Sequence, residues 1–216
     1  MKTLKTSHLS FLCKEPVSAA KKTVFFFSLS DQDSLSLPPF CHPVDTLVAE
    51  GICVISTTLP GHENNARPYN IQEIWQNDLL GLSSFISHLS LGIKELKEQF
   101  PPPFGVMGIS RGAFIALHMC SMLDEVTTAV CFAPMLSIGT NQELSAGNLL
   151  SKLENKKIHF FIGDNDIIVG TENVVRMQHS LQTNSEILVS PSIGRGGHGT
   201  SDEIFHKGAL WMIKNL

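Results

Sequence analysis

The chain has 216 residues, of which 43% are hydrophobic and 17% charged, and its formal net charge at pH 7 is −4. This length can bury a sizeable core and the composition is that of an ordinary globular protein, so we expect a single domain spanning residues 1–216. The acidic balance without a basic run argues against a nucleic-acid partner, and no apolar stretch approaches the ~20 residues of a membrane span.

Short apolar runs alternate with longer amphipathic segments along the chain. The N-terminal apolar patch in MKTLKTSHLSFLCKEP is interrupted by His8 and Ser10, which favours a strand over a signal peptide. Further strands are predicted at residues 23–30 and 52–58, in the run FGVMGIS ending at Ser110, and at 126–133, 157–163 and 185–190. Helices are predicted before Gly51, from 71 to about 100 with a break near Gly81 or Gly92, after Ser110, over 171–182, and after the capping residues Ser201 and Asp202.

Strand and helix therefore alternate at least five times. This pattern is typical of an α/β protein, and we expect a mostly parallel sheet of about six to seven strands with helices on both faces. In such folds the binding groups gather at the carboxyl ends of the strands. The position of each candidate residue relative to the strand ends is therefore a test of its function.

Ser110 lies in the pentapeptide GISRG, between Gly108 and Gly112. The motif follows a predicted strand and opens a predicted helix, which is the context that defines a nucleophile elbow. Glycines on both sides allow strand and helix to approach closely, and the helix N-terminus favours developing negative charge. Ser110 is therefore predicted to be a nucleophile, the alternative being a helix cap in an ordinary βα turn.

A serine hydroxyl needs a base, and the expected chain order is serine, acid, histidine. His198 follows the strand at 185–190 in a glycine-rich loop, whereas His179 and His206 lie in predicted helices. Asp164 and Asp166 follow the strand at 157–163, and the other acids of this region precede strands or open a helix. We therefore expect His198 to act as the base, and position alone leaves Asp164 and Asp166 as equal candidates for the acid.

No cofactor or metal ion is expected from the remaining motifs. Gly194, Gly196 and Gly199 spell GxGxxG, but in the last loop of the chain, where no βαβ unit can follow. There is no HExxH motif and no tight cluster of histidine and aspartate. The five cysteines are widely spaced without a CxxC motif, which indicates reduced thiols and a cytoplasmic location.

With these residues in order, the chain resembles the alpha/beta-hydrolase superfamily over nearly its whole length. The marks of this resemblance are LPGH at 59–62, GISRGAFIALH, FAP at 132–134, GDNDIIVGT and GGHG. The elbow and GDNDIIVGT are most similar to the prolyl-oligopeptidase-like and dienelactone-hydrolase-like branch, including its small bacterial members. The pattern of that branch implies that Asp166 is the acid, because Val169 follows it at the matching distance.

The resemblance also implies an oxyanion hole made of two backbone N–H groups. One belongs to Arg111, after the nucleophile, and the other to the loop after the strand at 23–30. Relatives often carry HG or HGG in that loop, whereas this chain has SLSDQDS, where Leu29 or Ser30 is the expected donor. We expect the Arg111 side chain to pair with Asp31 or Asp33, or to face solvent.

Family members often carry a lid between the strands at 126–133 and 157–163. Here the segment MLSIGTNQELSAGNLLSKLE has room for one short helix, so we expect an open site with a minimal lid or none. The prediction is a serine hydrolase that cleaves a small ester or thioester, free or on an acyl carrier, through an acyl-enzyme on Ser110. The alternatives are an acyltransferase using the same intermediate and a binding protein that has kept the fold without the chemistry.

Overall fold

The computed structural model describes residues 1–17, 19–68, 70–139, 144–181 and 184–216. The strands are β1 (Lys2–Lys5), β2 (Ser10–Lys14), β3 (Lys22–Phe27), β4 (Ile52–Ser56), β5 (Phe104–Ile109), β6 (Val126–Phe132), β7 (Lys157–Gly163) and β8 (Ser185–Ser190). The α-helices are α1 (Asp31–Ser36), α2 (His42–Ala49), α3 (Ile71–Asn77), α4 (Leu79–Leu96), α5 (Arg111–Met122), α6 (Leu150–Leu153), α7 (Thr171–Ser180) and α8 (Asp202–Asn215).

The strands form one eight-stranded sheet in the order β1-β2-β4-β3-β5-β6-β7-β8. The pairs β1–β2 and β2–β4 are antiparallel. The other neighbouring strands of the sheet pair in parallel. The predicted mostly parallel sheet is thus confirmed. It has one strand more than expected because the N-terminal segment forms a hairpin, in which Thr6 Oγ1 donates to the carbonyl of Leu9 at 2.9 Å.

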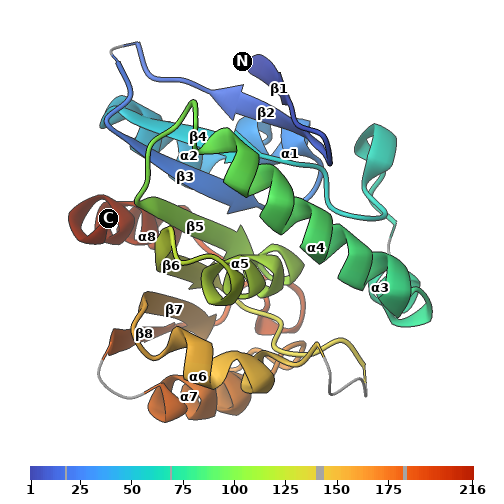
Figure 1. Ribbon diagram of the computed structural model, residues 1–216. Coiled ribbons are helices and arrows are strands. Elements are labelled where there is room, and N and C mark those ends of the chain that lie inside the picture. The colour runs from blue at the N-terminus through green and yellow to red at the C-terminus, as the bar shows by residue number, and fades with distance from the viewer. Residues whose placement is uncertain (18, 69, 140–143, 182–183) are drawn as a thin grey trace.

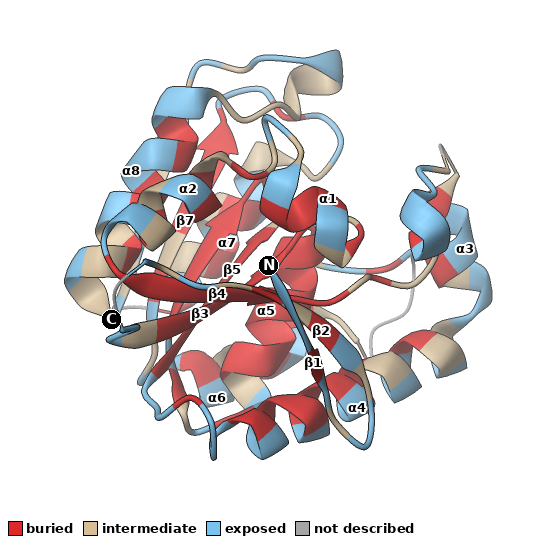
Figure 2. Ribbon diagram, turned by 90° about the horizontal axis from the view of Figure 1, so that it is seen from above, coloured by how far each residue is buried: buried red, intermediate tan, exposed pale blue. Residues whose placement is uncertain are grey.

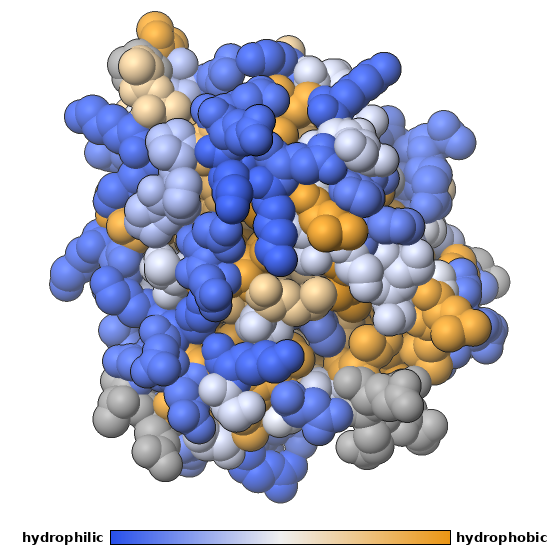
Figure 3. All heavy atoms as spheres, in the orientation of Figure 1, coloured by the Kyte–Doolittle hydropathy of each residue, from blue (hydrophilic) through white to orange (hydrophobic). Residues whose placement is uncertain are grey.

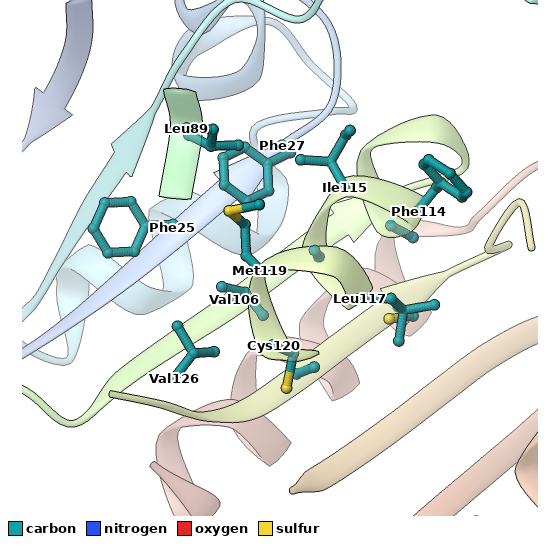
Figure 4. Packing of buried hydrophobic residues seen from close by; sticks show 14 of the residues in the cluster. Phe25, Phe27, Leu89, Val106, Phe114, Ile115, Leu117, Met119, Cys120 and Val126 are labelled. Atoms are coloured by element: carbon teal, nitrogen blue, oxygen red, sulfur yellow. The ribbon is translucent and has the colours of Figure 1, made fainter. Parts of the chain in front are cut away.

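Helices cover both faces of the sheet, as Figures 1 and 2 show from two directions. On one face α3, α4, α5, α6 and α7 bury the larger apolar cluster, and on the other α1, α2 and α8 bury the smaller one. Figure 4 shows part of the larger cluster, where Phe27, Val106 and Ile115 pack together from β3, β5 and α5. Hydrophilic residues cover most of the outer face seen in Figure 3.

Two helical regions differ in detail from the sequence prediction. The region from residue 71 is broken at Asp78, whose side chain accepts the backbone N–H of Gly81 and so starts α4. Residues 31–36, expected as part of a loop, form α1, because the hydroxyl of Ser30 accepts the N–H of Asp33 at 3.0 Å and caps the first turn. The predicted end of the helix at Gln182 lies outside the described residues, and α7 ends at Ser180.

The segment between β6 and β7 contains little secondary structure among its described residues. A 3₁₀ turn (Ala146–Leu149) leads into the four-residue helix α6. Residues 140–143 of the same segment lie outside the described part of the chain. The described residues agree with the expectation of one short helix in place of a substantial lid.

Candidate active site

Ser110 lies on the turn between β5 and α5 in a strained backbone conformation. Its φ of 52° and ψ of −111° belong to a region that residues with a side chain rarely adopt. The surrounding hydrogen bonds hold it there, since its N–H donates to Phe132 at 2.8 Å and its carbonyl accepts the N–H of Met135 at 3.2 Å. The strain presents the hydroxyl at the carboxyl edge of the sheet.

Gly108 and Gly112 are required by close backbone packing at this turn. A Cβ on Gly108 would overlap the backbone of Gly112, and a Cβ on Gly112 would overlap the carbonyl of Phe27 at the end of β3. The start of α5 thus lies directly against the chain that leaves β3. This contact brings the loop at residues 28–30 next to the serine.

His198 is brought to Ser110 from the loop after β8. Its Nε2 lies 2.8 Å from Ser110 Oγ, and its Nδ1 lies 2.8 Å from Asp166 Oδ2. Because a carboxylate only accepts, Nδ1 carries the hydrogen, and Nε2 is free to accept the hydrogen of the serine hydroxyl. The imidazole is 22% exposed and the Asp166 side chain 0% exposed, so solvent reaches the histidine and not the carboxylate.

The two aspartates that position alone could not separate have different surroundings. Asp166 Oδ1 accepts the N–H groups of Ile168 at 2.9 Å and Val169 at 3.1 Å, which leaves Oδ2 for His198. Asp164 is exposed, and its side chain accepts the N–H of Ser192 at 2.9 Å. Hydrogen bonds from Ser192 hold the pKa of Asp164 below its usual range. The structure therefore brings Asp166, and not Asp164, to the histidine.

Leu29 and Ser30, the two candidate oxyanion donors in the loop after β3, differ in the hydrogen bonds of their backbone N–H groups. The N–H of Leu29 donates to the buried hydroxyl of Ser34 at 3.2 Å. The N–H groups of Ser30 and Arg111 have no hydrogen-bond partner among the residues that the structure describes. Since α5 packs against this loop, Ser30 and Arg111 are the pair left available to an incoming oxygen atom.

The side chain of Arg111 pairs with neither Asp31 nor Asp33, so the first of its two expected placements is wrong, and it is only partly exposed to solvent. Asp33 is instead held by both Nε and Nη2 of Arg67, at 2.9 and 2.8 Å. The Arg111 guanidinium lies over the ring of Trp75 at 6.0 Å, and its Nε is buried without a hydrogen-bond partner in the described part of the chain. Burial lowers the pKa of Arg111 to about 10, so it remains charged at neutral pH.

A pocket of about 400 Å³ lies near Ser110, at the loops after β6 and β7. Its walls include Met135 and Leu136 after β6, and Ile168 and Val169 after β7. Met135 bonds to the Ser110 backbone and Val169 to Asp166, so the pocket adjoins the hydrogen-bonded residues. Gln72, Ser137, Ser145 and Asn173 also line it, so the pocket combines apolar and polar walls, as sites for small molecules do.

Within the described ranges, no group of three or more histidine, cysteine, aspartate or glutamate side chains could hold a metal ion. No α-helix in those ranges is long and apolar enough to cross a membrane.

Sequence reasoning missed Ser34, Arg67 and Trp75 as residues that shape the site. Arg67 lies 34 positions from its partner Asp33, so no local pattern could join them. Ser34 had a local signal, because a serine four residues after the Ser30 cap lies one helical turn above it. Trp75 lies on the buried side of the predicted helix, where an aromatic residue is ordinary core.

Comparison with solved structures places the fold. The chain is similar to the protein TT1662 from Thermus thermophilus, with a TM-score of 0.77 and 15% identity over 99% of this chain and 97% of the other. It is also similar to an esterase from Pyrococcus furiosus, with a TM-score of 0.72 and 18% identity over 95% and 86% of the two chains. An alpha-beta serine hydrolase homologue from Coxiella burnetii matches with a TM-score of 0.66 and 12% identity over 100% and 96%.

These similarities show that the chain has the alpha/beta-hydrolase fold. Its eight-stranded sheet, with a serine on the turn after β5, agrees with that assignment. No family model matches the sequence, and no curated protein matches it.

Proposed function

We propose that the protein is a serine hydrolase that cleaves a small carboxylic ester or thioester through an acyl-enzyme on Ser110. One observation carries the proposal: the two 2.8 Å hydrogen bonds that join Ser110, His198 and Asp166 in the order that nucleophilic catalysis requires. The strained turn at Ser110 supports it, because strain of this kind is retained where a reactive side chain must be exposed.

In the first half of the reaction Ser110 Oγ attacks the carbonyl carbon while His198 Nε2 takes the hydroxyl proton. The imidazolium that results is stabilised by the carboxylate of Asp166, which stays ionised. His198 then gives the proton to the leaving alcohol or thiol, and the acyl group remains on Ser110. In the second half, water attacks the acyl-enzyme with His198 again as the base, and the acid is released.

The backbone N–H groups of Arg111 and Ser30 are the proposed donors to the oxyanion. Both are without a partner in the described structure, and the contact between Gly112 and Phe27 keeps them on the same side of the turn. Such donors are fixed before the reaction, so they stabilise the developing charge without reorganisation, and one donor contributes roughly 3 kcal/mol.

The proposed substrate is small because the pocket that adjoins the site is limited in volume. The imidazole of His198 is partly exposed, and the pocket beside Ser110 has a volume of about 400 Å³. A pocket of this size accepts a small molecule. An acyl group on a carrier would reach the serine from the exposed side of His198.

A fluorophosphonate probe tests the proposal. The probe phosphonylates a serine only when a base activates the hydroxyl, so we expect it to label the wild-type protein and to spare Ser110→Ala. Ser121→Ala, which changes a serine at the far end of α5, serves as the control and is expected to label normally. A folded wild-type protein that the probe does not label would rule out the hydrolase function.

A further inference from the structure

Arg111 follows the nucleophile, and the proposed mechanism uses its backbone but not its side chain. The guanidinium lies over Trp75, its Nε is buried, and it forms no ion pair or side-chain hydrogen bond within the described part of the chain. Its unused donor is costly, since the Nε–H has lost water without gaining a hydrogen-bond acceptor. This cost indicates that a ligand supplies the missing partner.

His62 is a second side chain with an unused atom in the same region. It is only 1% exposed, and its Nδ1 lies 2.9 Å from the carbonyl of Ala66, so Nδ1 carries the hydrogen. Its Nε2 is buried without a hydrogen-bond partner in the described structure. Two orphaned polar atoms in one region are unusual, because buried polar groups are nearly always satisfied.

Trp75 connects these two residues. Arg111 lies over its ring, and its Nε1–H donates at 2.9 Å to the carbonyl of Pro60, two residues before His62. Burial lowers the pKa of His62, and the positive charge of Arg111 lowers it further. The nearby carboxylate of Asp33 is already occupied by Arg67 and does not neutralise Arg111.

The strand order shows which part of a substrate would reach this region. Ser110 follows β5, His198 follows β8 on one side, and His62 follows β4 on the other. The leaving group must lie toward His198, because His198 returns the proton to it. The part of the substrate that extends toward Arg111 and His62 is therefore the acyl portion.

We propose that Arg111, bordered by His62, binds a carboxylate on the acyl portion of the substrate, so that the preferred substrates are half-esters or half-thioesters of dicarboxylic acids. A guanidinium presents parallel N–H donors that match a carboxylate. The bound anion also offsets the Arg111 charge, which is one of the causes that lower the pKa of His62, after burial. The inference rests on the proposed hydrolase function.

Two pairs of isosteric esters test the inference. In the first pair the acyl portion ends in a free carboxylate (mono-p-nitrophenyl adipate) or in its methyl ester (methyl p-nitrophenyl adipate). In the second pair the same difference lies on the alcohol portion, with 4-acetoxybenzoate compared with methyl 4-acetoxybenzoate. The readout is the ratio of kcat/KM for the anionic ester to that for the neutral ester. We expect Arg111→Met to lower the acyl-side ratio about tenfold or more, the size of a charge-assisted hydrogen bond. The alcohol-side ratio should change far less.

Two further variants control this measurement. Lys94→Met also removes one positive charge, from an exposed position in the last turn of α4, and should leave both ratios unchanged. Arg111→Lys keeps the charge but loses the planar donors and should retain part of the selectivity. An acyl-side ratio that Arg111→Met does not lower, in a variant whose circular dichroism is native, would overturn the carboxylate site.

Binding to Ser110→Ala separates this inference from the proposed hydrolysis. Calorimetric titration with monomethyl adipate and dimethyl adipate measures recognition without turnover. Preference for the monoanion, lost in the Ser110→Ala/Arg111→Met double variant, supports the site even if the wild-type protein hydrolyses no ester. Equal or absent binding of the two compounds, beside normal labelling by the fluorophosphonate probe, would overturn the site and leave the hydrolase function standing.

Discussion

Ser34 Oγ accepts the backbone N–H of Leu29 at 3.2 Å, and this bond selects Ser30 as the available donor in the loop after β3. Ser34 lies on α1, which begins at the Ser30 cap, so the helix and the loop hold each other in place. The loop SLSDQDS contains no glycine, and a short helix orients its backbone.

Replacement of Ser34 by alanine should therefore weaken turnover. The variant leaves the N–H of Leu29 without its buried acceptor, which costs about 1–3 kcal/mol and loosens the loop that carries Ser30. We expect kcat/KM for p-nitrophenyl acetate to fall about tenfold or more. Ser36→Ala, at an exposed position of the same helix, is the matched control and should keep wild-type turnover. Equal activity of the two variants would refute this account of the loop.

Asparagine variants distinguish the two aspartates after β7. Asp166→Asn should lower kcat by about two to four orders of magnitude, because an amide cannot stabilise the imidazolium and can hold His198 in the wrong tautomer. Asp164→Asn should cause only a mild loss, since its partner Ser192 lies on the surface of the loop. The measurement is steady-state ester turnover, and similar mild losses in both variants would exclude the role given to Asp166.

A methyl group on Gly112 should damage both stability and turnover. Its Cβ would overlap the carbonyl of Phe27, and overpacking of this kind costs about 1–3 kcal/mol. Gly147→Ala is the matched control, because its Cβ would meet only Ser145 Oγ, at 3.5 Å. Thermal unfolding should show a lowered midpoint for Gly112→Ala alone, and equal midpoints would contradict the packing argument.

The buried His118 and the mostly buried His159 should make the fold sensitive to acid. Burial lowers the pKa of His118 and of His159 to about 4, below the ordinary 6.5. Between these values the unfolded chain binds protons that the folded chain does not. Stability is therefore complete above pH 6.5 and falls as the pH decreases toward 4.

His159→Phe tests this dependence without breaking a hydrogen bond, because both ring nitrogens of His159 are buried and have no hydrogen-bond partner among the described residues. Glu186 lies 3.6 Å away, but the imidazole is neutral at pH 7 and forms no ion pair there. Relative to wild type, the variant should gain about 2 kcal/mol more unfolding free energy at pH 5 than at pH 7 in urea titrations. The exposed His179→Gln should show no such gain.

Cys13 and Cys53 are placed to form a disulfide under oxidising conditions. Their Sγ atoms are 3.1 Å apart on β2 and β4, about 1 Å more than a disulfide bond. Oxidised glutathione should accept two electrons and two protons from the thiols, giving the disulfide and two molecules of glutathione. Peptide mapping should detect the Cys13–Cys53 link and thermal unfolding a higher midpoint, while Cys13→Ser should show neither. Oxidation confined to other cysteines would contradict this pairing.

The sequence by itself determined the alternation of strands and helices, the turn that carries Ser110, and the later loops that carry His198 and the two aspartates. These features are local: periodicity, glycine spacing and position after a strand depend on neighbouring residues. The choice between Asp164 and Asp166 required the resemblance to a known family in addition, and the hydrogen bonds of Asp166 agree with it.

Tertiary structure alone decided the features that depend on distant residues. Asp33 pairs with Arg67, and Arg111 lies over Trp75. In the loop after β3 the N–H of Leu29, and not that of Ser30, donates a hydrogen bond to α1. Each outcome depends on which loops the strand order brings together at the carboxyl edge of the sheet. A short-range sequence pattern does not specify the strand order. A charged or polar side chain has several possible partners, and the packing of the core determines which of them lies within reach.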